Sequence, residues 1–553
     1  MTDSRLTPSE GTDVPPELPE NPRTGRRRFV LGALSLSGGG LLLSTGCRGE
    51  HTVPTPQEPS AAPPAAQPPE PPSPPGAMPA LPEGKDPANF IVHGDSPPTL
   101  ETRREKLGTS VLTATSLLFV RQNLPLPPPE YVADRDGWRA RIEGVNNPME
   151  LTVAQLRQLG LATIATVLQC SGNGRKYYEH GPSGSPWGVG AAGCVMWSGV
   201  PLRNVVEHLG GLVGGVRYLT TTGGEPLPDG VERNSVVVER SIPIDKAMDD
   251  CLLAWEMNGE PLPRAHGGPL RLIVPGYFGC NQIKFVKQLA FTAEQGPAKI
   301  QQTGYRMRPI GLKGSPEQPP MWAMPVKSFI TTPTDRTPAL AGQVRVTGVA
   351  FGGEQPVTKV EVSTDGARWQ PARFVGPDLG RYAWRVFEAV IERQPGPVTL
   401  YSRATRADGE TQPEQRLENE RGYGNNAWRD MAVTVQVCAP GDAACLTPPP
   451  DPDAPADAEE GPRAPVVLSE AGQRGRLIFR EQAQPQCATC HTLDDAQAVG
   501  KVGPDLDALG RNLEQIEAAV TNGVGAMPPF GKTLTQQQID DVAQYVFEAT
   551  RKR

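Results

Sequence analysis

The pattern with the most direct chemical meaning lies near the C-terminus, where Cys487 and Cys490 precede His491 in the order C-x-x-C-H. Two thiols on one turn can bond covalently to the vinyl groups of a haem, while the adjacent imidazole reaches the iron. Farther along, Met527 stands in an Ala-Met-Pro-Pro-Phe loop that can present a thioether as the opposite axial ligand. The alternatives are a redox dithiol and a methionine that packs a loop. The pattern predicts haem c with His491 and Met527 as iron ligands.

The sequence around this motif supports a small helical module. By resemblance to class I cytochrome c, the Gly-Pro-Asp-Leu segment at 503–506 matches that family's loop before the next helix, and 537–549 would supply its closing helix. The region 467–553 resembles class I cytochrome c, which implies an all-α cytochrome c domain. Ligation of the iron by histidine and methionine raises its reduction potential, so the haem would accept electrons readily.

A second motif surrounds Cys170, in Leu-Gln-Cys-Ser-Gly-Asn-Gly-Arg. Alone, a cysteine at the end of an apolar strand is usually a buried structural thiol. Two further segments change this interpretation: Phe-Val-Arg-Gln-Asn-Leu-Pro at 119–125 and His-Gly-Gly-Pro-Leu-Arg at 266–271. With them, the chain from Phe90 to Val437 resembles the sulfite oxidase family of molybdopterin enzymes.

The resemblance implies a role for particular side chains. Cys170 would bind molybdenum through its thiolate, a soft ligand. The residues expected in the substrate pocket are Arg121, Arg175, Tyr305 and Arg421, with Trp187 lining it. The residues expected along the pterin cofactor are Phe119, Val120, Arg121, Gln122, Asn123, Cys170, His266, Arg271, Gln282, Ile283 and Lys284.

Arginine suits an oxyanion substrate, because a guanidinium group binds such anions in a fork geometry and stays charged. A single arginine is more often a surface charge, so the motif context decides. The chain departs from the family in three places. Gln122-Asn123 stands where many relatives have Asn-His, Gly174 replaces the first of two arginines after the ligand cysteine, and Cys280 adds an unusual thiol near the pterin segment.

The resemblance implies a sulfite dehydrogenase that oxidises sulfite to sulfate at a molybdenum-pterin centre. Its electrons would pass through the attached haem to an external cytochrome c or a terminal oxidase. One alternative is another sulfur substrate on the same fold, such as a sulfane sulfur. Sulfoxide reduction fits a high-potential haem poorly. A different class of protein, an electron-transfer or binding protein with an empty molybdenum domain, also stays open.

These residues must be positioned by several domains, because 553 residues exceed what one hydrophobic core usually organises. We expect an α+β molybdopterin-binding domain at 89–325 and an immunoglobulin-like β-sandwich at 326–438. Short alternating strands around Val344 and Val360, with an Asp365-Gly366 turn, indicate the sandwich. In the resembled family this sandwich is the dimerisation domain, which implies a homodimer. Proline-rich linkers are expected at 48–88 and 439–466.

The first 47 residues are typical of an export signal. Arg26 to Val30 read Arg-Arg-Arg-Phe-Val, and 31–43 are apolar and too short to span a membrane. We expect a twin-arginine signal peptide and a periplasmic protein, the alternative being a basic N-terminal tail. Cys47 closes a segment that resembles a lipoprotein cleavage box, and we favour a lipid anchor there over ordinary cleavage nearby.

The charge balance excludes one class of partner. Lys and Arg total 54 against 61 Asp and Glu, and no basic stripe suggests nucleic acid. Cys438 and Cys445 flank the start of the second linker. In an oxidising compartment they could form a small disulfide loop, and two free thiols are the alternative.

Overall fold

The computed structural model describes most of the chain beyond the predicted signal. The residues described are 81–447 and 466–551, apart from 96, 228–233, 235–237, 494, 497, 500–502, 505, 508–509 and 525–526. The predicted twin-arginine signal, Cys47, most of the spacer at 48–88 and most of the linker at 439–466 therefore lie outside the described residues. Asp505 of the Gly-Pro-Asp-Leu segment also lies outside them.

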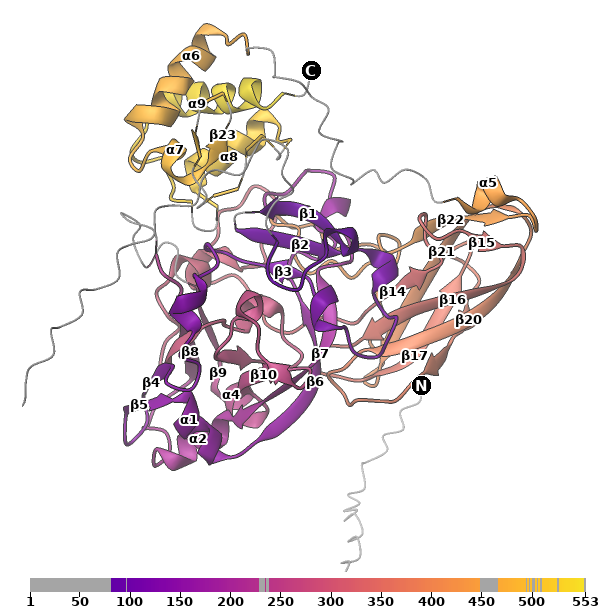
Figure 1. The fold of residues 1–553 in the computed structure, drawn as a ribbon, viewed down its shortest axis with the longest axis horizontal. Coiled ribbons are helices and arrows are strands. Elements are labelled where there is room, and N and C mark those ends of the chain that lie inside the picture. The colour runs from indigo at the N-terminus through magenta and orange to yellow at the C-terminus, as the bar shows by residue number, and fades with distance from the viewer. Residues whose placement is uncertain are drawn as a thin grey trace, which may run out of the picture. The chain divides into compact units, whose positions relative to one another are not determined.

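A small antiparallel sheet begins the described chain (Figure 1). It consists of β1 (Phe90–Asp95), β2 (Pro98–Thr102) and β3 (Val120–Arg121). Thr99 on β2 pairs with Arg121 on β3. The sheet therefore fixes the backbone of Arg121 at the end of its strand.

Two larger sheets form the α+β domain. The first has the order β11-β10-β7-β6, with β12 also paired to β10. Its strands are β6 (Ala162–Gln169), β7 (Ala192–Pro201), β10 (Leu252–Met257), β11 (Glu260–Pro261) and β12 (Arg271–Ile273). This sheet carries the end of β6, where Cys170 follows, and Arg271 at the start of β12.

The second sheet has the order β5-β4-β13-β8-β9, and β4 and β13 are its parallel pair. Its strands are β4 (Arg139–Glu143), β5 (Met149–Thr152), β8 (Tyr218–Gly223), β9 (Glu239–Pro243) and β13 (Val286–Thr292). The α-helices described in this domain are α1 (Val153–Leu156), α2 (Leu202–His208) and α4 (Ile244–Asp249).

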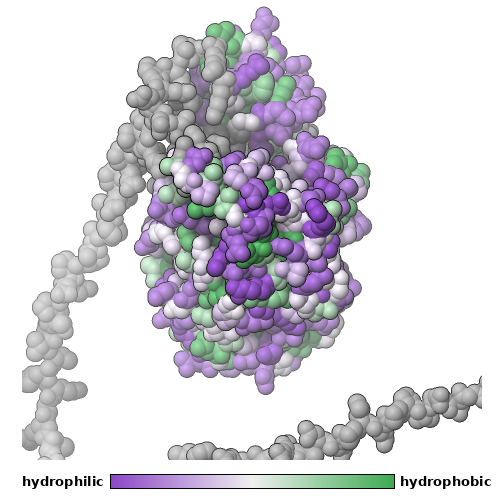
Figure 2. All heavy atoms as spheres, turned by 90° about the vertical axis from the view of Figure 1, so that its right-hand side faces the viewer, coloured by the Kyte–Doolittle hydropathy of each residue, from purple (hydrophilic) through white to green (hydrophobic). Residues whose placement is uncertain are grey.

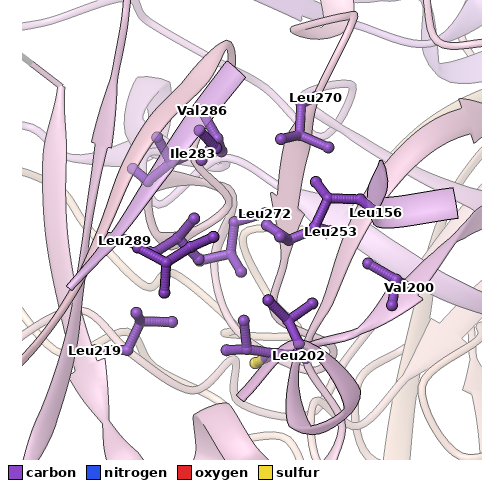
Figure 3. Packing of buried hydrophobic residues seen from close by; sticks show 14 of the residues in the cluster. Leu156, Val200, Leu202, Leu219, Leu253, Leu270, Leu272, Ile283, Val286 and Leu289 are labelled. Carbon is purple, nitrogen blue, oxygen red and sulfur yellow. The ribbon is translucent and has the colours of Figure 1, made fainter. Parts of the chain in front are cut away.

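The core of this domain joins both sheets. Figure 3 shows Leu253 and Leu272 from the first sheet facing Leu219 and Leu289 from the second. All four side chains are at most 1% exposed, and burial of each contributes about 1.5–3 kcal/mol. Ile283 belongs to the same core, so the segment between its neighbours Gln282 and Lys284 is anchored at its centre.

A β-sandwich follows, as predicted. One sheet has the order β14-β16-β20-β19 and the other β15-β22-β21-β17-β18. The strands are β14 (Lys327–Thr332), β15 (Ala339–Leu340), β16 (Gly342–Phe351), β17 (Val357–Ser363), β18 (Gln370–Pro371), β19 (Arg373–Val375), β20 (Arg385–Arg393), β21 (Gly396–Arg406) and β22 (Val433–Cys438). Inward-facing residues such as Val344, Val360 and Val435 form its core. Alternation of buried and exposed side chains is what a two-layer sandwich requires.

A disulfide closes the end of the sandwich. Cys438, the last residue of β22, is bonded to Cys445 in α5 (Ala443–Leu446). Of the two alternatives left open by the sequence, the structure contains the disulfide.

The C-terminal module is mostly helical, which confirms the prediction of an all-α domain. Its elements are α6 (Glu470–Leu477), α7 (Cys487–Cys490), β23 (Thr492–Leu493), β24 (Ala498–Val499), α8 (Leu513–Asn522) and α9 (Gln536–Ala549). Capping boxes start α8 at Asn512 and α9 at Thr535. They satisfy backbone N–H groups that the first turn of a helix leaves unbonded.

Figure 2 shows one face of the molecule, on which hydrophilic and hydrophobic side chains are interspersed. Exposed apolar residues of the sandwich include Leu340 and Val390, which are 50% and 49% exposed. Among the residues that the structure describes, no helix has the length and apolar character needed to cross a membrane.

Candidate functional site

Cys170 lies where β6 ends and the chain turns. Its backbone N–H donates to the carbonyl of Ala191 at 2.9 Å, and Asn173 N–H donates back to the carbonyl of Cys170 at 3.0 Å. The thiol is half-buried and belongs to no disulfide. A strand end followed by a tight turn therefore presents this thiol at the edge of the sheet, as a metal ligand requires.

Arg175 follows in the same turn and is 6% exposed. Its Nε donates to the carbonyl of Arg421 at 2.9 Å and its Nη1 to the carbonyl of Ser185 at 2.8 Å. A Cβ added at Gly172 would lie 2.4 Å from Nη2 of Arg175, so glycine leaves room for the guanidinium. Burial lowers the pKa of Arg175. No carboxylate bonds it among the described residues, so its charge remains available to an anion.

Arg421 and Tyr423 reach this place from the loop that precedes β22. The Arg421 guanidinium lies 5.8 Å from the centre of the Tyr423 ring, and the Arg175 guanidinium lies 5.4 Å from it. Tyr305 stacks on Tyr423 with 5.4 Å between ring centres and 27° between planes. Burial raises the pKa of Tyr305, so its phenol remains a neutral hydrogen-bond donor.

Arg121 connects this pocket to a second cluster. The charge of Arg121 opposes the rise in the pKa of Tyr305. The backbone carbonyl of Arg121 accepts from Nζ of Lys284 at 3.1 Å. The predicted substrate residues Arg121, Arg175, Tyr305 and Arg421 therefore lie around the turn that follows Cys170.

The second cluster is a set of cations around Lys284, of which Arg271 is buried and Lys284, Arg121 and Lys85 are half-buried. Burial and the charges of Arg271, Arg121 and Lys85 hold the pKa of Lys284 well below its usual value, and the charge of Glu225 opposes this shift. Burial also lowers the pKa of Arg271 to about 9 and that of Lys85 to about 7. Several like charges that are buried or half-buried are costly unless an anion sits among them.

Three polar atoms in this cluster also indicate that a ligand binds among these cations. Nε2 of His266, Nε of Arg271 and Oε1 of Gln282 are buried and have no hydrogen-bond partner within the described part of the chain. Buried polar groups are normally bonded, so these atoms fit a ligand that offers both acceptors and a donor. The residues present fit a pterin with an anionic phosphate, as the resemblance implied.

The other predicted cofactor residues are placed as follows. Val120 and Ile283 are buried in hydrophobic cores, so their side chains anchor the segment and leave the backbone to face a ligand. Phe119 packs edge-on against Trp187, which is fully buried. Nε2 of Gln122 donates to the carbonyl of Ala265 at 2.8 Å. Asn123 is half-buried.

The structure explains one departure from the resembled family, at Gly174, and shows the contacts of another, Cys280. Gly174 adopts φ +97°, and a Cβ there would lie 2.9 Å from Cβ of Asn425. A side chain at this position would be strained and would crowd Asn425. Cys280 accepts a hydrogen bond from the Ser171 hydroxyl at 3.3 Å, which places its thiol beside the turn after Cys170. Burial raises the pKa of this thiol.

The haem residues meet at a cavity whose lining also includes Arg121 and Asn123. Cys487, Cys490, His491 and Met527 all contribute to the lining of a cavity of about 260 Å³. Nδ1 of His491 lies 2.9 Å from the carbonyl of Pro504, so Nδ1 carries the proton and leaves Nε2 free to bind iron. A Cβ at Gly503 would lie 2.4 Å from Cε1 of His491. The thiols, the oriented imidazole and the thioether fit a covalently bound haem.

Sequence reasoning missed two buried cations, Arg240 and Lys327, and the half-buried Lys85. Arg240 is beside Tyr305, Lys85 is in the pterin cluster, and Lys327 bonds the Cys170 turn. Each is a single cation outside any motif, and its neighbours in the sequence are of kinds that also surround cations at protein surfaces. No sequence signal distinguished them.

Comparisons with known proteins agree with this geometry. Three family models match: oxidoreductase molybdopterin binding domain at 126–300, Mo-co oxidoreductase dimerisation domain at 318–436, and cytochrome C oxidase, cbb3-type, subunit III at 470–546. They define a molybdopterin oxidoreductase with a cytochrome c domain, whose cofactors are Mo-pterin and haem c.

Similar proteins show which family of molybdopterin oxidoreductases the chain belongs to. Sulfite oxidase of Gallus gallus is 30% identical over 383 residues, covering 63% of this chain and 81% of that protein. Mitochondrial sulfite oxidase of Rattus norvegicus is 28% identical, covering 62% of this chain and 65% of that protein. The sulfane dehydrogenase SoxCD of Paracoccus pantotrophus has a TM-score of 0.52 at 26% identity, covering 62% and 87%. The chain belongs to the sulfite oxidase family.

Proposed function

We propose that this molybdenum-dependent sulfur oxidoreductase is an exported sulfite dehydrogenase. It oxidises sulfite to sulfate and passes the electrons through its own haem c to an external cytochrome or oxidase. The observation that carries the proposal is the buried guanidinium of Arg175. It is fixed by the carbonyls of Arg421 and Ser185 and is bonded by no described carboxylate, so it suits a small oxyanion.

The chain's own residues bind and orient the substrate. Arg121, Arg175 and Arg421 bind the oxygens of sulfite, and the neutral phenol of Tyr305 donates a further hydrogen bond. Cys170, His266, Arg271 and Lys284 would hold the molybdenum-pterin group, which supplies a two-electron oxidation when bound. The reaction consumes one sulfite and one water and releases sulfate, two protons and two electrons.

The haem module completes the path for the electrons. His491 and Met527 would hold the iron at a high potential, which suits an electron acceptor. The linker predicted at 439–466 keeps the module at a high effective concentration near the molybdenum domain.

The test is to mix molybdenum-loaded enzyme with sulfite, without an external acceptor, and to follow the absorption bands of reduced haem. We expect rapid reduction in the wild type and none in Cys170→Ser, because the variant lacks the thiolate ligand of the metal. Dithionite serves as the control, since it should reduce the haem in both proteins. A wild-type haem that dithionite reduces and sulfite does not would reject sulfite as the substrate.

A second candidate function is oxidation of a sulfane sulfur. It is favoured by the likeness to the sulfane dehydrogenase SoxCD, with its TM-score of 0.52 and 26% identity. The same haem assay, repeated with a carrier-bound sulfane sulfur, separates the two functions. Reduction by the sulfane substrate alone would replace the proposal.

Location and assembly are part of the proposal. The Arg-Arg-Arg-Phe-Val segment supports export by the twin-arginine route to the periplasm. Cys47 supports a lipid anchor, and the matched dimerisation domain supports a homodimer.

A further inference from the structure

Arg240 on β9 is a buried arginine beside the pocket, and it is 1% exposed. Its Nε and Nη2 both donate to Oδ1 of Asn281, at 3.3 Å and 3.2 Å. Its Nη1 donates to the carbonyl of Ile300 at 3.1 Å. All its described hydrogen-bond acceptors are neutral, so the cost of burying this charge is not offset by a carboxylate.

The two acceptors belong to two functional segments. Asn281 immediately precedes the pterin segment, which runs from Gln282 to Lys284. Its side-chain amide donates to the carbonyl of Met321 at 2.8 Å. The carbonyl of Ile300 also accepts the backbone N–H of Tyr305 at 3.2 Å. One guanidinium thereby connects the pterin segment with the turn that ends at Tyr305.

The guanidinium also faces the Tyr305 ring, 5.4 Å from its centre. At this distance a cation is attracted to the face of an aromatic ring. The ring stacks on Tyr423 as well, and Tyr423 neighbours Arg175 and Arg421. Tyr305 is therefore held by ring contacts and through the acceptor that it shares with Arg240.

We propose that Arg240 is a positioning residue for Tyr305: its fork fixes the phenol relative to the pterin segment, and its buried positive charge strengthens anion binding in the pocket. The role of Tyr305 rests on the proposed function. Fixed geometry matters because small displacements of a group that contacts the reacting substrate reduce turnover strongly.

Arg306 offers a matched control. It is also 1% exposed, and it donates to three neutral acceptors, the carbonyls of Gln301 and Gln318 and Oε1 of Gln295. Arg306 follows Tyr305 in the chain, but among the described residues the cation over the Tyr305 ring is that of Arg240. General damage from removing a buried arginine should therefore affect both positions alike.

The experiment uses the full-length holoenzyme with Arg240→Lys, Arg240→Gln and Arg306→Lys, each checked for molybdenum content and Tm. We expect Arg240→Lys to keep KM for sulfite within about twofold and to lower kcat about tenfold. Lysine keeps the positive charge but lacks the guanidinium that bonds both Asn281 and Ile300. We expect Arg240→Gln to raise KM about fivefold as well. Arg306→Lys should leave both constants within about twofold.

A Tyr305→Phe background gives the decisive comparison. If Arg240 acts through Tyr305, Arg240→Lys should lower kcat by less than about twofold in that background. Full additivity with Tyr305→Phe, or an equal kcat loss in Arg306→Lys, would overturn the inference. So would loss of molybdenum from Arg240→Lys.

Failure of the proposed function is recognised separately, by a wild-type enzyme that does not oxidise sulfite. Sulfate binding, measured by calorimetry on the molybdenum-loaded proteins, then tests Arg240. We expect Arg240→Gln to weaken sulfate about fivefold, and Arg240→Lys and Arg306→Lys to bind like the wild type. Equal affinity in all four proteins would contradict the inference.

Discussion

The cations of the pocket bond to neutral acceptors. Arg175 donates to two backbone carbonyls, and Lys327 donates to the carbonyls of Asn173 and Asn425 at 3.2 Å and 2.9 Å. Backbone carbonyls orient a cation without neutralising it. These residues therefore hold positive charge and geometry together, and Lys327 connects the turn after Cys170 with the loop that carries Arg421.

Lys327 predicts a pH dependence of stability. Burial lowers its pKa from 10.5 to about 7, while the charge of Asp430 opposes the shift. Between these values the unfolded chain binds more protons than the folded chain, so this group makes the free energy of unfolding rise with pH. Below pH 7 the folded protein bears the full cost of burying the charge.

We expect the Tm of the wild type relative to Lys327→Met to increase by about 5 °C between pH 6 and pH 9. Thermal melts followed by tryptophan fluorescence at one scan rate measure this difference. Lys359→Met, on an exposed side chain paired with Glu361, serves as the control and should show no such trend. A wild-type advantage that is constant across this pH range would contradict the assigned pKa.

At the scale of elements, close approach of the backbone decides how the haem module packs. α6 and α9 cross at Gly475, where an added Cβ would lie 1.9 Å from the carbonyl oxygen of Asp541. Arg474 pairs with the Asp541 carboxylate at 2.7 Å beside this crossing. Glycine at this position lets the two helices approach closely enough to close the core around the haem cavity.

Gly475→Val should destabilise the haem module by about 1–3 kcal/mol, because the side chain overpacks the crossing of α6 and α9. Circular dichroism in the haem absorption band, followed during heating, measures the loss. Gln473→Ala on the exposed part of α6 is the control and should change stability little. An unchanged melting temperature for Gly475→Val would mean that the crossing tolerates a larger spacing.

At the scale of the whole molecule, the domains have different degrees of independence. The haem module has a core of its own, formed by residues between Ile478 and Val546. The molybdenum pocket needs two domains, because Arg421 and Lys327 come from the chain beyond the α+β domain. We therefore expect the haem module to form its own folding unit, and the molybdopterin-binding domain and the β-sandwich to form a second unit together.

The separate core predicts the effect of cutting the linker. In the full chain, the rate of haem reduction by sulfite should not depend on enzyme concentration, because the acceptor is tethered. When residues 1–447 and 466–553 are produced separately and mixed, the rate should rise in proportion to the added haem module. Stopped-flow absorption over a range of concentrations measures both cases. Concentration dependence in the full chain would indicate that electrons pass between molecules.

Features whose chemistry is local could be predicted from the sequence alone. Cys487, Cys490 and His491 stand within one turn because the two vinyl groups and the iron of one haem require that spacing. The alternating strands around Val344 and Val360 predict a sandwich because side chains of a strand point to opposite faces. The motif around Cys170 predicts its cofactor by resemblance.

The identity of the cations that share the pocket, and the way in which they are held, depend on the packing of distant segments. Arg240 and Tyr305 lie 65 positions apart, and Lys327 bonds residues from segments on both sides of it in the sequence. Nothing in the neighbouring residues of a single Arg or Lys shows whether it will be buried, because that depends on surfaces brought together by the packing of distant segments. The same holds for Gly174, which adopts φ +97° and where a side chain would also crowd Asn425 of the second domain.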